Sequence, residues 1–371
     1  MNKDRRRVKV RHLSTVHDIR DTRVTYKECA HLRQAGFDVA LMSCVDESTE
    51  LGGVPIIGIG RARNRPHRML VKTVTMLRRA LAERADVYHF HDPELIPVGL
   101  ALKAFGKTVV YDVHEDVPKQ ILHKFWIKDA IKKPLAAATR FVEGVGARAF
   151  DLLVTATPSI AERFPAHKTI VCQNFPELDL ASSRNETPFA DRQNAFVYVG
   201  GLSRQQGLFE MLAAFEQLPE TETGVLAGKF KQSQDEAMAT PGWRHVRWPG
   251  VLTRPEVVEI LRDGRVGLVL NHPITNYIDA YSTKMFEYMA CGLPVICSNF
   301  PLWTKIVSES GCGEAVDPFD TDAVAAALNR YLDDPDLAAR TGEAGRQAIM
   351  ASYNWTAEVD KLIGAYDSLT D

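Results

Sequence analysis

The sequence predicts an α/β protein made of two doubly wound, Rossmann-like domains in series. The chain has 371 residues, about twice the length of a usual single domain. Short apolar segments alternate with amphipathic ones through residues 8–156, and the alternation restarts at residue 195 after a polar stretch. Such alternation is typical of parallel sheets with helices on both faces, and two domains of this kind are expected to face each other across a ligand-binding cleft.

The first domain opens as a β-α-β unit. We expect strands at 8–14 and 37–43, joined by a loop rich in His, Asp and Arg and by a helix over 22–35. A strand at 54–59 leads through a basic loop into a helix over 67–84. The remaining strands of this domain are expected at 86–91, 108–114 and 151–156.

The segment 121–148 breaks this regular spacing. It mixes large apolar side chains with lysines, which is a composition suited to a membrane surface. A core helix whose lysines extend into solvent is the alternative, and the sequence leaves both interpretations open. The apolar residues are Phe125, Trp126 and Ile127, and the lysines are Lys124, Lys128, Lys132 and Lys133.

A polar stretch without periodicity predicts a linker at 177–193, between a first domain at 1–176 and a second at 194–352. A final helix over 355–369 has no strand after it, and we expect residues 353–371 to pack back on the first domain. The second domain should contain strands at 196–199, 224–227, 246–248, 266–270 and 295–297, and helices at 208–217, 254–262, 284–291, 321–332 and 335–350.

The composition indicates well-packed domains with an uneven distribution of charge. Hydrophobic residues make up 45% and charged residues 25%, with a net charge of -2. Residues 1–175 contain 29 Lys and Arg against 19 Asp and Glu, and the remainder contains 16 against 28. The basic half suggests an anionic partner such as a lipid headgroup, a pyrophosphate or a nucleic acid, or else a mere scatter of surface charge.

Cysteine spacing and hydropathy indicate a cytoplasmic protein. No apolar run approaches the roughly 20 residues needed to cross a bilayer, and the basic opening of the chain is not followed by the apolar core of a signal peptide. The six cysteines show no paired metal-binding spacing, so we expect reduced thiols at Cys29, Cys44, Cys172, Cys291, Cys297 and Cys312.

The stretch 279–298, DAYSTKMFEYMACGLPVICS, predicts a helix whose first turn is suited to an anion. Ser282 or Thr283 is placed to cap the helix. Lys284 adds a cation to the same turn, which opposes the helix dipole unless an anion such as a phosphate lies between them. Gly292 should end the helix in a left-handed conformation before a short strand.

Two acids flank the start of this helix. Asp279 precedes it and Glu287 lies in its second turn, so one site at the helix start can meet both carboxylates. Considered one at a time, these residues are more simply interpreted as a helix cap, a surface lysine and a solvated glutamate.

Candidate ligand-binding residues also follow the predicted strands, because doubly wound sheets bind ligands at the carboxyl ends of strands. In the second domain, Gly200 and Gly201 allow a backbone to approach a diphosphate closely, and Arg204 can neutralise it. In the first domain the strand ends carry His17, Asp18, His89, His91, Asp92, Glu94, His114, Glu115 and Asp116.

A metal site is not expected. The one short ligand pair on a single element is His89-x-His91, whose spacing places both rings on one face of a strand, one buried and the other at the sheet edge. The sequence also contains no phosphate loop, dinucleotide turn or Ser-His-Asp elbow, which argues against nucleoside triphosphate hydrolysis and hydride transfer.

Several of these segments together resemble the family 4 retaining glycosyltransferases, which have the GT-B fold. The VGG turn, WPGVLTRPEVVEIL and DAYSTKMFEYMACGLPVI look like the donor-binding half of that family. STVHDIRDTRVTYKE, HFHDPELIPVGLALK and YDVHEDVP resemble its bacterial polysaccharide branch. The resemblance covers most of the chain, and the combination is more specific than any one segment.

The resemblance implies a role for each matching residue. Glu287 would bind the ribose of a nucleotide, and Asp279, where the family usually has Glu, would bind the donor sugar beside His114. Relatives carry Arg after the first glycine of the turn and Lys or Arg before the next one, whereas this chain has Gly201 and Gln206. Donor-binding residues would be Gly200, Gly201, Arg204, Arg247, Ser282, Thr283, Lys284 and Glu287, and acceptor-binding residues His17, Asp18, Asp21, Arg23, His91, Asp92, Glu94 and Glu115.

The resemblance thus implies a metal-independent, retaining transfer of a sugar from a nucleotide diphosphate sugar, without a further cofactor. The acceptor would be a carbohydrate or a polyprenyl-linked sugar, at the inner face of an anionic membrane in one alternative, and no nucleic acid is expected as a partner. A nucleotide-sugar epimerase or hydrolase of related fold is a second alternative. A non-catalytic nucleotide-sugar-binding protein is a third, for which the missing cations near Gly200 argue.

Overall fold

The computed structural model describes residues 7–123, 127–182, 185 and 187–370. Two compact units make up the chain, one formed by Met1–Asn174 with Ala357–Asp371 and the other by Phe175–Thr356. The second unit therefore begins before the expected linker. Within the expected linker, 177–193, helix α8 (Leu178–Ser182) buries Leu180 and Ala181 in the core of the second unit.

The first unit contains an eight-stranded sheet in the order β3-β4-β2-β1-β5-β6-β7-β8. All neighbours are parallel except β3, which pairs antiparallel with β4. The chain leaves β1 in one direction for β2 and later returns on its other side as β5, so the sheet's topological switch point lies between β1 and β5. The strands are β1 (Lys9–Ser14), β2 (Asp38–Ser43), β3 (Thr49–Leu51), β4 (Val54–Gly58), β5 (Val87–Phe90), β6 (Thr108–Val113), β7 (Leu152–Thr155) and β8 (Thr169–Val171).

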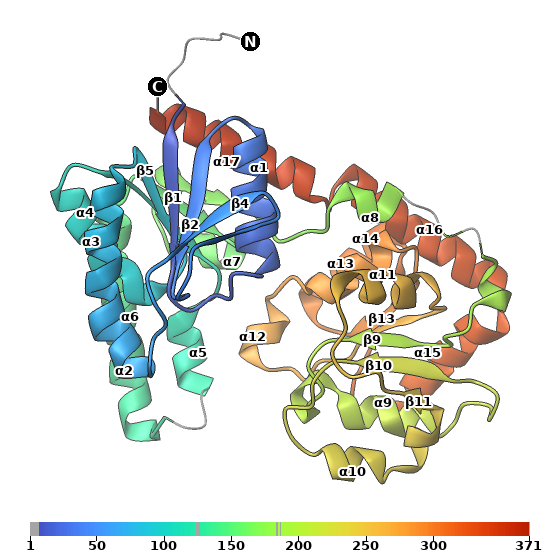
Figure 1. The fold of residues 1–371 in the computed structure, drawn as a ribbon. Coiled ribbons are helices and arrows are strands. Elements are labelled where there is room, and N and C mark those ends of the chain that lie inside the picture. Colours follow the sequence, from blue (N-terminus) through green and yellow to red (C-terminus); the bar gives the residue numbers. More distant parts are fainter. Residues whose placement is uncertain (1–6, 124–126, 183–184, 186, 371) are drawn as a thin grey trace. The chain divides into compact units, whose positions relative to one another are not determined.

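Helices cover both faces of this sheet (Figure 1). On one face, α3 (Thr73–Glu83), α4 (Ile96–Ala104) and α6 (Asp129–Ala149) pack over a core that includes Met76, Leu102 and Ala147. On the other lie α1 (Ala30–Gln34) and α17 (Trp355–Thr370), where the ring of Tyr366 contacts that of Phe37. Residues 357–371 of the last helix thus belong to the first unit. The shorter elements are α2 (Arg65–His67), η2 (Arg68–Lys72), η3 (Pro93–Leu95), α5 (Val117–His123), α7 (Pro158–Ala161) and η4 (Ala166–Lys168).

The helix expected over 22–35 begins as a π-helix, η1 (Thr22–Cys29), before it continues as α1. Asp21 caps it by accepting from the backbone N–H of Val24 at 2.9 Å. Within η1, Arg23 and Glu28 are buried, although both are charged. π-Helical turns are rare and occur frequently at functional sites, and this one places an arginine and a glutamate side chain inside the unit.

The segment 121–148 forms parts of two helices, α5 and α6, although Lys124, Phe125 and Trp126 lie outside the described residues. Of α6, Ala136, Glu143, Gly146 and Ala147 are buried. Ile131, Leu135, Phe141, Val142 and Val145 are exposed. None of the helices in the described ranges is long and apolar enough to cross a membrane.

The second unit contains a six-stranded sheet in the order β11-β10-β9-β12-β13-β14, and its recorded pairings are all parallel. Its switch point lies between β9 and β12. The strands are β9 (Val197–Val199), β10 (Gly224–Ala227), β11 (Val246–Arg247), β12 (Gly267–Val269), β13 (Val295–Ser298) and β14 (Gly313–Val316).

Two clusters of buried residues fill the second unit. One includes residues of α9 (Leu208–Phe215) and α15 (Thr321–Asp333), and the other residues of α11 (Arg254–Arg262), α13 (Thr283–Ala290) and α14 (Pro301–Ser310). The remaining elements are η5 (Phe189–Asp191), η6 (Arg204–Gln206), α10 (Gln234–Met238), η7 (Pro241–His245), α12 (Thr275–Ile278) and α16 (Pro335–Ala351). All six cysteines of the chain are free thiols, and Cys29, Cys172, Cys297 and Cys312 are buried.

Candidate functional site

Helix α13 is anchored against the central strands of the second unit. The hydroxyl of Tyr288 accepts from the backbone N–H of Val199 at 3.0 Å, at the end of β9. Its ring lies across Gly267 on β12, where a Cβ atom would come within 2.4 Å of it. As expected, Gly292 follows the helix with a positive φ of 71°. The first turn of α13, with Lys284, is therefore held at the carboxyl end of β9.

The glycine turn after β9 lies directly beside Lys284. Gly200 has φ 154°, and a Cβ atom there would be 3.3 Å from both Cδ and Nζ of Lys284. Its carbonyl packs so closely on Gly228 that a Cβ at Gly228 would come within 1.8 Å of it. Two strand-end glycines thus bring bare backbone next to a lysine and a helix start, which is an arrangement suited to a phosphate.

A pocket of about 610 Å³ opens at this edge of the sheet. Of the predicted donor-binding residues, Gly200 and Gly201 line it, together with Lys229 and Lys231 from the loop after β10. A Cβ at Gly201 would be 2.7 Å from Cε of Lys231. Lys231 therefore occupies the space beside the position where relatives carry an arginine. Sequence reasoning missed both lysines, although they follow a predicted strand end in the same way as the residues that it selected.

Burial changes the acid-base behaviour of Lys284. It lowers the pKa of this lysine to about 8, because the surrounding protein disfavours the ammonium. Glu287 acts in the opposite direction, and Lys231 adds to the lowering by repulsion. The ammonium also lies 5.3 Å from the centre of the Tyr198 ring. Two lysines that repel each other beside bare backbone are stabilised by an anion placed between them.

The other candidate residues of the stretch 279–298 differ in their contacts and exposure. Ser282 is the N-cap residue of α13, but its side chain makes no capping hydrogen bond within the described chain, which corrects the expected cap. Thr283 is the first, exposed residue of the helix. Glu287 is half-buried and pairs with Arg254 of α11 at 2.6 Å. Asp279 lies on an exposed turn after α12.

Two predicted donor-binding arginines point elsewhere. Arg204 forms an ion pair with Glu236 and lies over the ring of Phe209, 4.1 Å from its centre. Arg247 donates to the side chain of Asn194 at 3.1 Å. Neither lines the pocket. Lys231, rather than Arg204, lies beside Gly201, since its Cε and Nζ would be 2.7 and 3.3 Å from a Cβ atom there.

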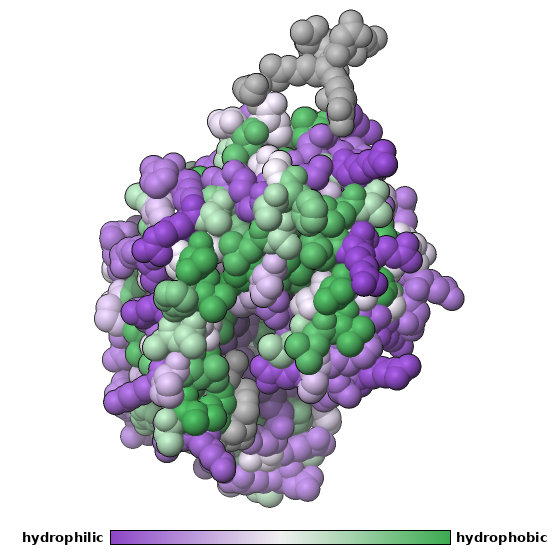
Figure 2. All heavy atoms as spheres, turned by 90° about the vertical axis from the view of Figure 1, so that its left-hand side faces the viewer, coloured by the Kyte–Doolittle hydropathy of each residue, from purple (hydrophilic) through white to green (hydrophobic). Residues whose placement is uncertain are grey.

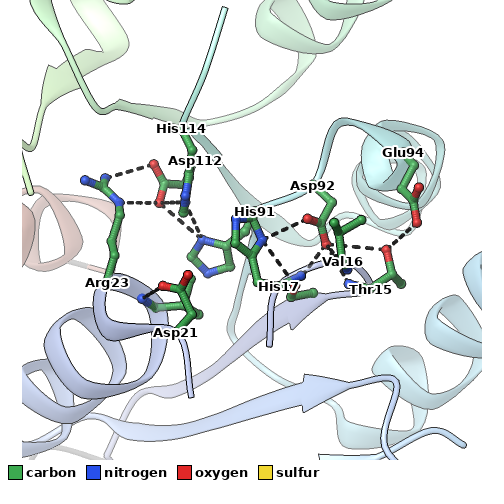
Figure 3. A network of polar contacts seen from close by, with 12 residues as sticks. Thr15, Val16, His17, Asp21, Arg23, His91, Asp92, Glu94, Asp112 and His114 are labelled. Carbon is green, nitrogen blue, oxygen red and sulfur yellow. Dashed lines mark hydrogen bonds and ion pairs between the residues drawn. The ribbon is translucent and has the colours of Figure 1, made fainter. Parts of the chain in front are cut away.

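In the first unit, Asp112 at the end of β6 gathers three of the predicted residues (Figure 3). Its Oδ2 lies 2.7 Å from Nε2 of His114 and 3.2 Å from Nδ1 of His91. Arg23 binds both oxygens, at 3.1 and 3.3 Å. Burial would raise the pKa of Asp112, but Arg23 and His114 hold it well below its ordinary value. The carboxylate thus stays ionised, and it orients the ring of His114 at the sheet edge.

A second carboxylate, Asp92, orders the loop after β1 (Figure 3). It accepts from the backbone N–H groups of Thr15 and Val16 at 2.6 and 3.1 Å and pairs with His17 at 2.9 Å. Burial alone would raise its pKa, but His17 and these N–H groups lower it to about 2. Burial likewise opposes the charge of His17, yet the bond to Asp92 raises its pKa above the ordinary value. The His17 ring lies 4.7 Å from that of His114.

The predicted acceptor-binding residues lie in different surroundings. Arg23 and His91 are buried, and their polar atoms are bound inside the unit. Asp21 serves as a helix cap, and Glu94 is held by Arg68 at 2.8 Å. Asp18 accepts from the N–H of Arg20, and Glu115 accepts from Gln120, so both belong to local exposed turns. His17 and His114 remain as the half-buried pair at the strand ends.

Three histidines lie stacked behind this edge, deeper in the unit. His12 on β1 is in register with His89 on β5, and their ring centres are 4.4 Å apart. His91 lies 4.7 Å from His89, and it too is buried, which corrects the expectation that one of this pair reaches the sheet edge. Burial lowers the pKa of all three below its ordinary value. Sequence reasoning did not select His12, Glu28 or Asp112, because each lies inside a strand or helix that it treated as core.

The whole chain is similar to solved two-domain glycosyltransferases. Sucrose-phosphate synthase from Thermosynechococcus elongatus superimposes with a TM-score of 0.76 at 20% identity, over 98% of this chain and 99% of that one. HepE from Anabaena in complex with UDP gives 0.75 at 14% identity, over 97% of this chain and 100% of that one. The fold of the chain is thus the GT-B fold of glycosyltransferases.

Family models cover both units. The model of group 1 glycosyl transferases matches residues 181–348, and that of the glycosyl transferase 4-like domain matches residues 22–170. The chain belongs to the family 4 glycosyltransferases. Glycogen synthase from Mycobacterium tuberculosis is 26% identical over 288 residues, which are 73% of this chain and 66% of that protein. The chain thus spans just under two thirds of the length of this relative.

Proposed function

We propose that the protein is a retaining glycosyltransferase that moves a sugar from a nucleotide diphosphate sugar to a carbohydrate or lipid-linked acceptor. The observation that carries the proposal is the phosphate-ready edge of the second unit. There Lys284, Lys231 and the start of α13 lie beside the bare backbone of Gly200 and Gly201, at a pocket of about 610 Å³. A pocket of this size is suited to a ligand of nucleotide dimensions.

These groups fit the chemistry of the leaving group. Cleavage of a sugar-phosphate bond develops negative charge on the departing diphosphate, and fixed cations and backbone N–H groups stabilise that charge as it grows. In the proposed reaction Lys284, Lys231 and the first turn of α13 perform this role, and the transfer step requires no metal ion at the diphosphate and no further cofactor.

His114 is proposed to position the transferred sugar. Its Nε2 donates to Asp112 at 2.7 Å, because a carboxylate only accepts hydrogen bonds. In the neutral ring, Nδ1 is then an acceptor for a sugar hydroxyl. Asp279 is proposed to bind a further hydroxyl of the donor. We name no protein nucleophile: retention is proposed to follow from attack on the face that the leaving group vacates, with the departing phosphate taking the acceptor's proton.

Glu287 provides the sharpest test of donor binding. Replacement of Glu287 by Gln removes a charged acceptor for ribose hydroxyls while keeping the shape of the side chain. We expect affinity for the preferred nucleoside diphosphate to fall about 10- to 100-fold, as is usual when a charged hydrogen bond is lost. Thermal shifts with UDP, GDP, ADP and dTDP would first identify the base, and calorimetric titration would then measure the affinity.

The matched control for this experiment is Glu259→Gln, which changes an exposed glutamate of neighbouring α11. Unchanged nucleotide affinity in Glu287→Gln would refute the assignment.

The two rival functions differ in turnover. An epimerase or hydrolase converts the donor without an acceptor, whereas a non-catalytic binding protein transfers sugar to no acceptor at all. The nearby Lys229 and Lys231 remove the main argument for the latter.

The acceptor is proposed to be presented at an anionic membrane surface, on the cytoplasmic side. Figure 2 shows hydrophobic atoms gathered over the face on which α3, α4 and α6 lie. Large apolar side chains are exposed on η2 and the start of α3, namely Leu70, Val71 and Val74, and on α6 at Phe141 and Val142. Lys128, Lys132, Lys133, Arg65, Arg68, Lys72, Arg78 and Arg79 belong to the same segments, so apolar and basic groups occur together as at a membrane interface.

Co-sedimentation with lipid vesicles tests this part of the proposal. We expect the protein to bind vesicles that contain anionic phosphatidylglycerol and to remain in solution with neutral phosphatidylcholine. Leu70→Glu combined with Phe141→Glu should abolish binding and leave nucleotide affinity unchanged, because both residues belong to the first unit. Equal sedimentation of this variant and the wild type would contradict a membrane role for the surface.

A further inference from the structure

The interior of the first unit holds a group of polar atoms that the proposed transfer does not use. His12 on β1, His89 on β5 and Glu28 on η1 are fully buried. Nε2 of His12, Nε2 of His89 and Oε2 of Glu28 have no hydrogen-bond partner in the part of the chain that the structure describes, whereas Oε1 of Glu28 is paired with Arg23 at 2.9 Å. Buried polar atoms are nearly always bound to something, so three such atoms on neighbouring elements point to a missing partner.

The residues that carry these atoms lie close enough together to share one partner. Each of His12, Glu28, His89 and His91 offers one nitrogen or oxygen, and the four atoms lie within 4.8 Å of one another. Two ligands of one tetrahedral zinc ion are roughly 3.3–3.6 Å apart, since each bond is about 2.0–2.2 Å long. The most distant pair in the group would have to approach by about 1–1.5 Å to hold such an ion.

Hydrogen bonds determine which nitrogen of His12 is unprotonated. Asp112 only accepts, so the neutral ring of His91 donates to it from Nδ1, and Nε2 of His91 is then an acceptor. That atom lies 2.9 Å from Nδ1 of His12, which must donate to it. The remaining nitrogen of neutral His12, Nε2, therefore carries a lone pair, and this is the atom that lacks a partner.

The other ring nitrogen of each histidine is held as in known metal sites. Metal-binding histidines commonly donate their second N–H to a carboxylate, a carbonyl or another acceptor, which fixes the ring. For His12, this series of hydrogen bonds runs from Nδ1 through His91 to Asp112. For His89, Nδ1 lies 2.8 Å from the hydroxyl of Tyr366 on α17. In both residues Nδ1 is engaged, which leaves Nε2 for a further partner.

The buried charges also leave room for a cation. Arg23 is paired with two carboxylates, Asp112 at 3.1 Å and Glu28 at 2.9 Å. One guanidinium between two ionised carboxylates leaves an excess of one negative charge in a region without solvent. A proton on Glu28 cancels this excess, and a bound divalent cation replaces it with one positive charge. The unpaired nitrogens of His12 and His89 favour a metal, because a proton on Glu28 would satisfy at most one of them.

We propose that the first unit binds a divalent transition-metal ion, best matched by Zn²⁺, through His12 Nε2, His89 Nε2 and the carboxylate of Glu28. Imidazole nitrogens with one carboxylate are ligands that zinc prefers. The ion would join β1, β5 and η1 at the switch point of the sheet, behind the row formed by Asp112, His91 and His114. Its role would be structural, because all three ligands are closed off from solvent.

The test is the metal content of the intact protein, prepared without a histidine tag from cells grown with added zinc. We expect about one zinc ion per chain, retained through dialysis against EDTA in the folded state and released in guanidinium chloride, since a fully buried ion escapes only on unfolding. In crystals, an anomalous difference peak at the zinc edge should lie between His12, His89 and Glu28.

Variants and alternative outcomes complete the test. In Glu28→Gln and in His89→Gln, the zinc content per chain should fall at least tenfold. His167→Gln, which changes an exposed histidine, should keep the zinc content of the wild type. If either ligand variant fails to fold, the zinc content of the wild type and the position of the anomalous peak still test the proposal. Less than about one tenth of an ion per chain, after growth and refolding with zinc or cobalt, would overturn the proposal and indicate a protonated Glu28. A peak located elsewhere would overturn it equally.

Discussion

Lys284 carries a charge that its surroundings disfavour, and this makes ligand binding sensitive to pH. With a pKa of about 8, the free enzyme loses this proton well below the pH at which an ordinary lysine does. A bound diphosphate favours the ammonium and raises the pKa of Lys284. By linkage, nucleotide affinity should therefore decrease above pH 8, by up to about tenfold per pH unit.

Calorimetric titrations between pH 7.5 and about 9.5 would reveal this decrease. Lys284→Met should weaken binding and abolish the pH dependence over that range. The control is Lys305→Met, because this exposed lysine of α14 pairs only with solvent-exposed Glu309 among the contacts recorded for it. A pH profile that stays flat in the wild type would show that Lys284 does not contact the diphosphate.

Asp112 and His114 are neighbours with different expected roles. Asp112→Asn leaves the buried groups of Arg23 and His91 without their carboxylate, so it should lower the free energy of unfolding by about 3–5 kcal/mol. His114→Gln changes a half-buried ring at the edge and should lower kcat about tenfold, the usual effect of one lost hydrogen bond, with nearly unchanged stability. Denaturant titration and turnover measurements on both variants separate the roles, and equal destabilisation by both would refute this division.

Local chemistry allowed only some of the site residues to be predicted. Lys284 and Gly292 could be predicted because each depends on the sequence of a single helix. A cation in the first turn of a helix and a glycine after its last turn are both visible without knowledge of the tertiary structure. Lys231 approaches Gly201 only through the pairing of β9 with β10, and Asp112 meets Arg23 across residues that are far apart in the sequence. Such partners depend on tertiary structure. The ion pair of Arg204 with Glu236 is a contact of the same kind.

At the level of elements, Gly267 controls the position of α13. An alanine there would place its Cβ atom 2.4 Å from the ring of Tyr288, which is fully buried and cannot move away. We expect Gly267→Ala to lower the free energy of unfolding by about 1–3 kcal/mol, as overpacking does. The shift of α13 should also weaken nucleotide binding.

Gly364→Ala serves as the comparison, since a Cβ atom at this helical position of α17 meets nothing within 4 Å. This variant should be about 0.5–1 kcal/mol more stable than the wild type, because glycine is a poor helix former. Thermal or denaturant unfolding would measure both changes. A Gly267→Ala protein as stable as the wild type would mean that α13 tolerates displacement.

The long apolar strands and most of the long helices were predictable, whereas helix α14 and several short elements were missed. β3, β8 and β14 have three or four residues each, none of which is buried, so their apolar pattern is weak. The segment expected as a linker contains α8, a helix of five residues whose contribution to the core rests mainly on Leu180 and Ala181. Hydrophobic periodicity does not detect elements this short.

At the level of the whole molecule, each unit has its own hydrophobic core, so the two should unfold separately. Differential scanning calorimetry should resolve two transitions. A nucleoside diphosphate should raise the midpoint of only one of them, because ligand binding stabilises the unit that holds the site. The Lys284→Met variant should lose that shift. A single transition that moves as a whole would contradict independent units.

The last helix has a consequence for the order in which the protein is made. Leu362 and Tyr366 of α17 are fully buried and belong to the unit whose strands come from the first 174 residues. During translation the ribosome must therefore complete the whole second unit before the first can close its core. Domains synthesised early usually fold early. Here the N-terminal domain has to wait with part of one face of its sheet uncovered, and nascent chains that stall before residue 357 should depend most on chaperones.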